Sequence, residues 1–239
     1  HGPHLPLDTD TRIAMVLAEG LVGRYEAGEL MVTPPVTITA SGEHAAFPGT
    51  LSVGSTVMEQ YIIELVRSAD WSAGVVLVNG HGGNHSAVDR AVRLLRTEHR
   101  RVLSWWPRVE GGDAHAGDTE TSIMLAIAPE LVHMERAAAG ATAPLADLID
   151  AMREGGVRAV SENGVLGDPR RALIEHRDRS PHRLVGISLR EYRLIIGAGV
   201  EQRGDGDGQI AHGFLAASWS NRSSASCSRS SGCTRASRA

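Results

Sequence analysis

Three short segments of this 239-residue chain bring imidazoles and carboxylates together in a way that suits metal-dependent hydrolysis. His1 and Asp10 lie at the two ends of a proline-containing segment, and His81 lies in the sequence NGHGGN. His115 precedes Glu120 by five residues in a third segment. Imidazole and carboxylate groups suit Zn, Fe(II), Mn or Co, and one carboxylate can bridge two cations. The pattern therefore predicts a metal site that includes His1, Asp10 and His81.

Each of these residues also has a purely structural interpretation. Asp10 can cap the helix that follows it, and His81 can be a polar residue in a glycine-rich turn. Glu120 can be a first-turn carboxylate that the helix dipole favours. Glycine-rich loops after strands can also cradle phosphate, but NGHGGN is neither GxGxxG nor a P-loop, and no Lys follows it. The occurrence of three such segments in one chain favours the metal site.

The remaining candidate residues concern proton transfer and substrate contact. An imidazole near its unperturbed pKa both gives and takes protons, so we expect His115 to protonate a departing amine. Glu120 either orients His115 or completes a metal shell. Glu43 and His44 lie in a loop that contains Gly and Pro, and Trp105 ends a predicted strand. We expect these three to line the substrate pocket, Trp105 through its large ring.

The elements that must position these residues alternate between helix and strand. Helical periodicity covers residues 11–26, 55–68, 85–98 and a stretch from 119 onward. Strand-like runs cover residues 31–32 together with 36–39, residues 74–78 and residues 101–105. This alternation predicts an α/β protein, a three-layer αβα fold with a mostly parallel central sheet and right-handed crossovers. Ligand sites in such sheets lie outside the carboxyl ends of the strands, where NGHGGN follows the run VVLV.

Composition places the chain among ordinary globular proteins. Hydrophobic residues make up 42% and charged residues 22%, which suits one large α/β domain. The net charge of −4 gives no electrostatic reason to expect nucleic acid or an anionic membrane as a partner. No apolar stretch approaches the ~20 residues of a membrane span. Both cysteines, Cys227 and Cys233, lie near the C-terminus, so we expect a core without disulfides and a cytoplasmic location.

The C-terminal part of the sequence differs from the rest. The stretch RGDGDG at residues 203–208 has the composition of a linker, and residues 218–239 are rich in Ser, Arg and Ala. Such a tract has little to bury, which predicts a disordered tail. A sharper hypothesis is a change of reading frame soon after Asp168. We therefore expect a hydrolase domain at residues 1–169 and a divergent tail at residues 170–239.

Five motifs, in order, resemble those of the creatininase (creatinine amidohydrolase) family. They are HGPHLPLDTDTRIA, SGEHAAFPGTLSVG, VVLVNGHGGN, DAHAGDTETSIML and GVRAVSENGVLGDP, and they span residues 1–169. Within that family the chain looks most like the creatininase-like peptidases of the mycofactocin system. The resemblance implies that His1, Asp10 and His81 are metal ligands with Asp10 bridging, that His115 is catalytic, and that the fold is creatininase-like.

The chain departs from the family pattern in two places. Gly83 stands where creatininase proper carries a glutamate, two residues after the histidine of NGH, and we expect Glu120 to supply the carboxylate instead. The family also has a metal-binding glutamate two positions before the residue that matches His1. We therefore expect that the chain is truncated at its N-terminus, and that a first strand precedes His1 in the intact protein.

The resemblance also implies an activity. It implies a hydrolase of amide or peptide bonds with two divalent cations (Zn, Fe or Mn), assembled as a homo-oligomer that is hexameric in the family. The implied substrate is a modified precursor peptide, from which a C-terminal Val-Tyr dipeptide is released. One alternative is a creatininase-type amidohydrolase of a small cyclic amide or a formamide. Another, of a different class, is an inactive truncated remnant or an interaction module.

Overall fold

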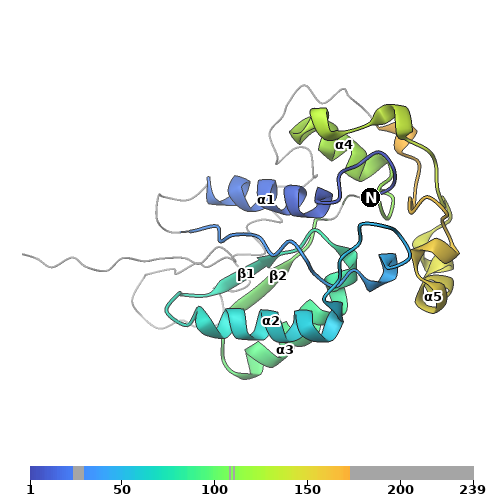
Figure 1. Cartoon of the computed structure of the whole chain (residues 1–239). Helices are drawn as coiled ribbons and strands as arrows, with labels where there is room; N and C mark the ends of the chain where they lie inside the picture. The colour runs from blue at the N-terminus through green and yellow to red at the C-terminus, as the bar shows by residue number, and fades with distance from the viewer. Residues whose placement is uncertain (24–29, 108, 110, 173–239) are drawn as a thin grey trace, which may run out of the picture.

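Two parallel strands lie between layers of helices in the computed structural model, as Figure 1 shows. The structure describes residues 1–23, 30–107, 109 and 111–172. The expected tail and the proposed change of frame concern residues that lie almost wholly outside this described part. Strand β1 (Val75–Val78) pairs with strand β2 (Val102–Trp105), with Val75 opposite Val102 and Val78 opposite Trp105. The run of β-branched residues in β1 is what a strand covered on both faces requires.

Helices α2 (Gly54–Ser68) and α3 (His85–Thr97) cover one face of the strands. Apolar residues recur along each helix at three- and four-residue spacing, so each presents one stripe to the core. That stripe packs against the side chains of alternate strand residues, which point to this face. The main members of this cluster are Met58, Ile62, Ile63, Val66, Val75, Leu77, Val88, Val92, Leu95 and Val102.

Helix α1 (Thr9–Val22) covers the opposite face, where it meets the other alternating set of strand residues. Leu21 and Val76 are buried there together, and Leu103 packs against them. Helix α4 (Asp118–Ile127) packs beside α1 through Ile13, Leu17, Ile123 and Met124. The predicted three-layer αβα fold with a parallel sheet is therefore confirmed.

The chain beyond α4 returns to the body of the domain by way of helix α5 (Leu145–Gly155). Leu166 then pairs with His115 in an isolated antiparallel bridge, in which Leu166 N–H donates to the His115 carbonyl at 2.8 Å. Short 3₁₀ helices occupy connecting positions at Gly42–His44, Gly82–Asn84, Pro129–Leu131, Met134–Arg136, Val157–Ala159 and Pro169–Arg171. Within the described part of the chain, none of the helices has the length and apolarity that crossing a bilayer requires.

Most predicted elements are found close to their expected bounds, with three differences. Helix α1 begins at Thr9, two residues before the predicted start, and ends at Val22. The strand predicted at residues 36–39 is wrong, because that segment has no strand conformation. Pro34 and Pro35 cannot donate ladder hydrogen bonds, and the segment lies along a cavity instead of pairing with β1 or β2. Helix α5 was not predicted.

The α3 packing generates a stability prediction. Leu95 is fully buried among α2, α3 and the strands, whereas its neighbour Leu94 is 40% exposed. Leu95→Ala removes core contacts and leaves a cavity, so we expect a loss of about 2–5 kcal/mol in the free energy of unfolding by urea. Leu94→Ala is the matched control and should change that free energy by at most about 0.5 kcal/mol. Equal effects of the two substitutions would contradict this description of the core.

Candidate active site

The carboxylate of Asp10 lies between two imidazoles at the carboxyl edge of the strands. Its Oδ1 is 2.9 Å from His1 Nε2, and its Oδ2 is 2.9 Å from His81 Nδ1. Asp10 lies within the first turn of α1, while His81 is in the loop that leaves β1. The competing interpretation of Asp10 as a helix cap does not fit, because residue 8 is the N-cap and Asp10 contacts the imidazoles.

The hydrogen bonds of His81 require a positive charge between His81 and Asp10. Nε2 of His81 lies 3.0 Å from the carbonyl oxygen of Ala40, which can only accept, so Nε2 carries a hydrogen. The opposite nitrogen, Nδ1, faces a carboxylate oxygen. Without a proton or a cation between them, two lone pairs would face each other at 2.9 Å. The donor set of imidazole and carboxylate therefore fits a divalent cation at this position.

The ionisation of these groups follows from their contacts. Burial would lower the pKa of His81, but hydrogen bonds to Asp10 and Glu43 outweigh it and raise this pKa to about 10. Burial would likewise lower the pKa of His1, but the Asp10 carboxylate outweighs burial, and the pKa of His1 is raised. For Asp10, burial acts to raise the pKa, and the two imidazoles hold it well below its usual range. Without a cation, protons on His1 and His81 supply the positive charge that Asp10 requires.

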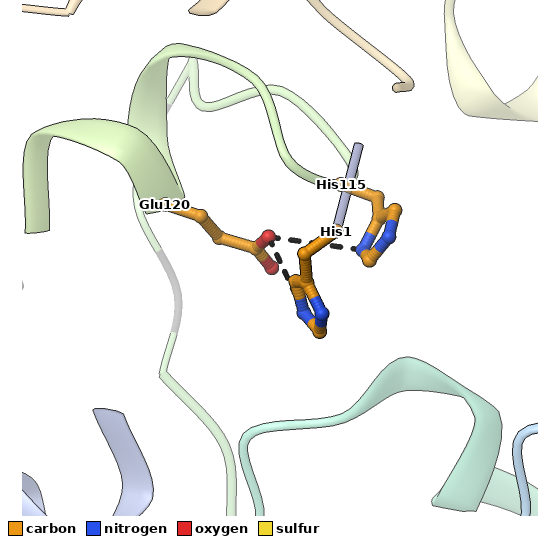
Figure 2. Close-up of side chains that lie close together, drawn as sticks. All are labelled: His1, His115 and Glu120. Carbon is orange, nitrogen blue, oxygen red and sulfur yellow. Dashed lines mark ion pairs between the residues drawn. The ribbon is translucent and has the colours of Figure 1, made fainter. Parts of the chain in front are cut away.

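Figure 2 shows a second cluster, formed by His1, His115 and Glu120. One ligand atom from each lies within 4.8 Å of the other two, so this group can hold a metal ion. Glu120 Oε2 lies 3.9 Å from His1 Nε2 and 3.7 Å from His115 Nδ1. Burial raises the pKa of Glu120 to about 7. Burial and the neighbouring His1 lower the pKa of His115 well below its usual value, so His115 is neutral at pH 7.

The N-terminus of α4 positions Glu120 and His115. The Asp113 carboxylate accepts hydrogen bonds from the N–H groups of Asp118 and Thr119, which satisfies two donors of the first helical turn. Ala116, which lies between His115 and the start of α4, is fully buried and has φ +51°. This conformation is uncommon for a residue with a Cβ. The Ala116 N–H donates to Glu120 Oε2 at 2.7 Å. The turn before α4 therefore holds the Glu120 carboxylate toward His1 and His115.

The two asparagines of NGHGGN fix the loop that carries His81. Asn79 and Asn84 are buried, and Asn84 Nδ2 donates to Asn79 Oδ1 at 2.9 Å. Asn84 Oδ1 accepts the N–H of Ala40 at 3.0 Å, and Asn79 Nδ2 donates to the carbonyl of His81 at 2.7 Å. A Cβ at Gly80 would lie 2.6 Å from the Asp10 carbonyl oxygen. Glycine at this position thus permits the loop to approach α1.

A cavity of about 620 Å³ opens beside these clusters. His1, Asp10, His44, His81 and His115 are among its polar lining residues. Its apolar lining residues include Met15, Val32, Pro34, Pro35, Val36, Ile38, Phe47, Leu51 and Met58. This volume is in the range of small-ligand sites, which run from roughly 300 to 1,000 Å³.

The three residues predicted to line the pocket occupy different places. His44 lines the cavity, and its ring centroid lies 4.6 Å from that of His115. Glu43 is not part of the lining; its Oε1 lies 3.2 Å from His81 Nε2, on the ring edge opposite Asp10. Trp105 is also absent from the lining and packs against core residues on the α1 face. Only His44 of these three therefore has the predicted placement.

Sequence reasoning did not identify Ala40 and Asp113 as part of the site. Ala40 acts through its backbone carbonyl, which no side-chain pattern can reveal. Asp113 lies five residues before the start of α4, too far to be recognised as a cap from helix signals alone. The buried asparagine pair was noted only as part of a loop motif.

Comparisons of sequence and of structure with known proteins both find creatininases and proteins related to them. A family model described as creatininase, creatinine amidohydrolase, matches residues 1–182. The mycofactocin precursor peptide peptidase of Mycolicibacterium smegmatis is 50% identical over 184 residues, which cover 75% of this chain and 74% of that protein. A crystal structure of creatinine amidohydrolase (creatininase) superposes with a TM-score of 0.64 at 21% identity, covering 85% of this chain and 87% of the other. A structure named "Creatininase Mn" gives a TM-score of 0.61 at 21% identity, over 78% of this chain and 82% of that one.

The role of Asp113 at the start of α4 can be tested by its removal. Asp113→Ala leaves two helix N–H groups without their acceptor, so we expect a loss of about 1 kcal/mol in the free energy of unfolding by urea. Asp150→Ala is the control, since Asp150 is 89% exposed on α5 and, among the described residues, its carboxylate pairs with Arg153. Asp113→Ala should also weaken cation binding, because Asp113 holds the first turn of α4, and Glu120 lies in that turn. Unchanged stability together with unchanged cation binding would contradict the positioning role.

Proposed function

The chain belongs to the creatininase family, and we propose that it is a metal-dependent hydrolase that cleaves a peptide bond. The observation that carries this proposal is the Asp10 carboxylate, which presents one oxygen to each of two imidazoles at 2.9 Å. A carboxylate in that position would offer one ligand oxygen beside each imidazole. The proposed ligands of the two cations are His1, Asp10, His81 and Glu120. The proposed hydrolase domain comprises residues 1–169, followed by a divergent tail.

When bound, the cations would supply Lewis acidity for polarising the scissile carbonyl and activating water. The chain's own contribution is proton transfer and positioning. His115 is neutral and its Nε2 is buried without a hydrogen-bond partner among the described residues, so it can take a proton from the attacking water. It then gives that proton to the nitrogen of the departing amine, which leaves with a neutral amino group. Glu120, beside Nδ1 of His115, stabilises the ring while it is charged.

We propose a peptide as the substrate because a large apolar cavity adjoins the polar cluster. A mycobacterial relative is named for cleavage of the mycofactocin precursor peptide. The proposed reaction releases a C-terminal Val-Tyr dipeptide from the modified precursor. The apolar wall, which includes Phe47 and Leu51, offers contacts for an aliphatic and an aromatic side chain. A small amide such as creatinine would fill little of this volume.

Three further properties belong to the same proposal. The cations are Zn, Fe or Mn, all of which accept imidazole and carboxylate ligands. The chain assembles as a homo-oligomer, as the family resemblance implies. It acts in the cytoplasm, where its precursor peptide would be made.

The test of the proposed function compares two substrates and one variant. The chain should release a dipeptide from a synthetic peptide that ends in Val-Tyr, and it should turn over creatinine far more slowly. His81→Ala removes a ligand that also pairs with Asp10, so we expect hydrolysis to be abolished and one of two bound cations to be lost. Circular dichroism should remain that of a folded chain. Faster turnover of creatinine would favour the small-amide alternative, and absence of bound metal would favour the inactive remnant.

The role of His115 is tested separately from metal binding. His115→Ala removes the proton carrier, and we expect kcat to fall by roughly 10²- to 10⁴-fold. The metal content should stay unchanged, because the proposed ligand set does not include His115. His133→Ala is the matched control: that imidazole is half exposed and pairs with Glu135 away from the cavity. Loss of a cation in His115→Ala would instead make His115 a ligand beside His1 and Glu120.

A further inference from the structure

Glu43 lies against the edge of the His81 ring that faces away from Asp10. Its Oε1 is 3.2 Å from His81 Nε2, the nitrogen that also contacts the Ala40 carbonyl at 3.0 Å. Ser41 Oγ lies 3.3 Å from the same nitrogen. Three oxygen atoms therefore surround Nε2, and the Glu43 carboxylate is the one that carries a charge. Glu43 does not line the cavity, so the structure offers no direct contact between it and a substrate.

We propose that Glu43 is a positioning residue for the cation held by His81 and Asp10. Its carboxylate, with the Ala40 carbonyl, keeps the hydrogen of His81 on Nε2, so that Nδ1 stays unprotonated and directed at the cation. Carboxylates and carbonyls behind a ligating imidazole fix its tautomer and increase its basicity toward the metal. The inference rests on the proposed function, because it assigns a role at the same cation site.

The space around Gly83 supports this assignment. A Cβ at position 83 would lie 2.4 Å from the Ala40 carbonyl oxygen and 2.5 Å from both Glu43 Oε1 and His81 Nε2. All three distances are far below van der Waals contact. Two of these atoms are the acceptors proposed to hold the hydrogen of Nε2, and the third is Nε2 itself. Only glycine at position 83 therefore permits the carboxylate to approach the ring.

The same carboxylate also contacts the neighbouring imidazole of His44. Glu43 Oε1 lies 3.2 Å from His44 Nδ1, and His44 Nε2 is buried without a hydrogen-bond partner among the described residues. If Glu43 holds the hydrogen of His44 on Nδ1, the lone pair of His44 is on Nε2. One carboxylate thus sets the hydrogen positions of two imidazoles that line the cavity.

The experiment measures cation affinity, which does not depend on turnover. Metal-free chain is titrated with Zn²⁺ in competition with a chromophoric chelator, and with Co²⁺ while its visible absorption is recorded. Glu43→Ala should weaken one of two binding sites by roughly 10- to 100-fold and leave the other unchanged. Glu43→Gln keeps an acceptor oxygen but loses the charge, so its loss should be smaller. At saturating Co²⁺, both variants should still bind two ions.

A pair of glycine variants supplies the matched control. Gly83→Ala should displace Glu43 and the Ala40 carbonyl, and so weaken the same site. Gly82→Ala should leave both affinities unchanged, because a Cβ there has nothing within 4 Å. Circular dichroism and urea unfolding identify any variant that does not fold. If Gly83→Ala is unfolded, the two Glu43 variants decide the question alone.

Several outcomes would overturn the inference. Wild-type affinity at both sites in Glu43→Ala would remove Glu43 from the cation site. Loss of one ion at saturating Co²⁺ would make Glu43 a direct ligand, and an equal loss at both sites would indicate a general structural effect. Failure of the proposed function has a different signature, since the unsubstituted chain would then bind no divalent cation.

Discussion

The contact of one largely buried carboxylate with two imidazoles is the constraint on which the site depends. A carboxylate removed from water is costly unless positive charge compensates it, and Asp10 obtains that compensation from His1 and His81. Each partner comes from a different part of the fold: the N-terminal segment, the first turn of α1 and the loop after β1. The αβα arrangement brings these three segments to the carboxyl edge of the strands. The charge of Asp10 is therefore compensated only when the segments are packed together as in this fold.

The imidazoles of the site have opposite electrostatic environments. His81 lies between two carboxylates, and these raise its pKa to about 10 despite its burial, so it holds positive charge. For His115, burial dominates, and the imidazoles of His1 and His44 lower its pKa further. Two imidazoles are thereby separated: without a cation His81 is charged, whereas His115 is neutral and able to accept a proton. Such a separation is a common property of acid–base sites.

The sequence predicted the parts of the fold that depend on local pattern. The β-branched run of β1 predicts a strand, and the apolar stripe of α3 predicts a helix. Together they place NGHGGN at the carboxyl edge of the strands. The segment at residues 36–39 was predicted incorrectly because its β-branched residues indicate a strand. Whether a strand forms depends on a pairing partner, and Pro34 and Pro35 remove donors. Among site residues, the grouping of His1, Asp10, His81, His115 and Glu120 was foreseen. The position of Glu43 behind His81 was not, because it depends on packing around Gly83 between segments distant in sequence.

The bridge between His115 and Leu166 has a consequence for how the domain matures. The backbone of His115 exchanges hydrogen bonds with Leu166, which lies 51 residues later along the chain. Domains generally fold as units, and contacts between distant segments form slowly because loop closure precedes them. His115 therefore acquires its final place only after the segment around Leu166 has docked. A chain in which that segment has not docked would hold the charged cluster of His1, Asp10 and His81 without His115 in its final place.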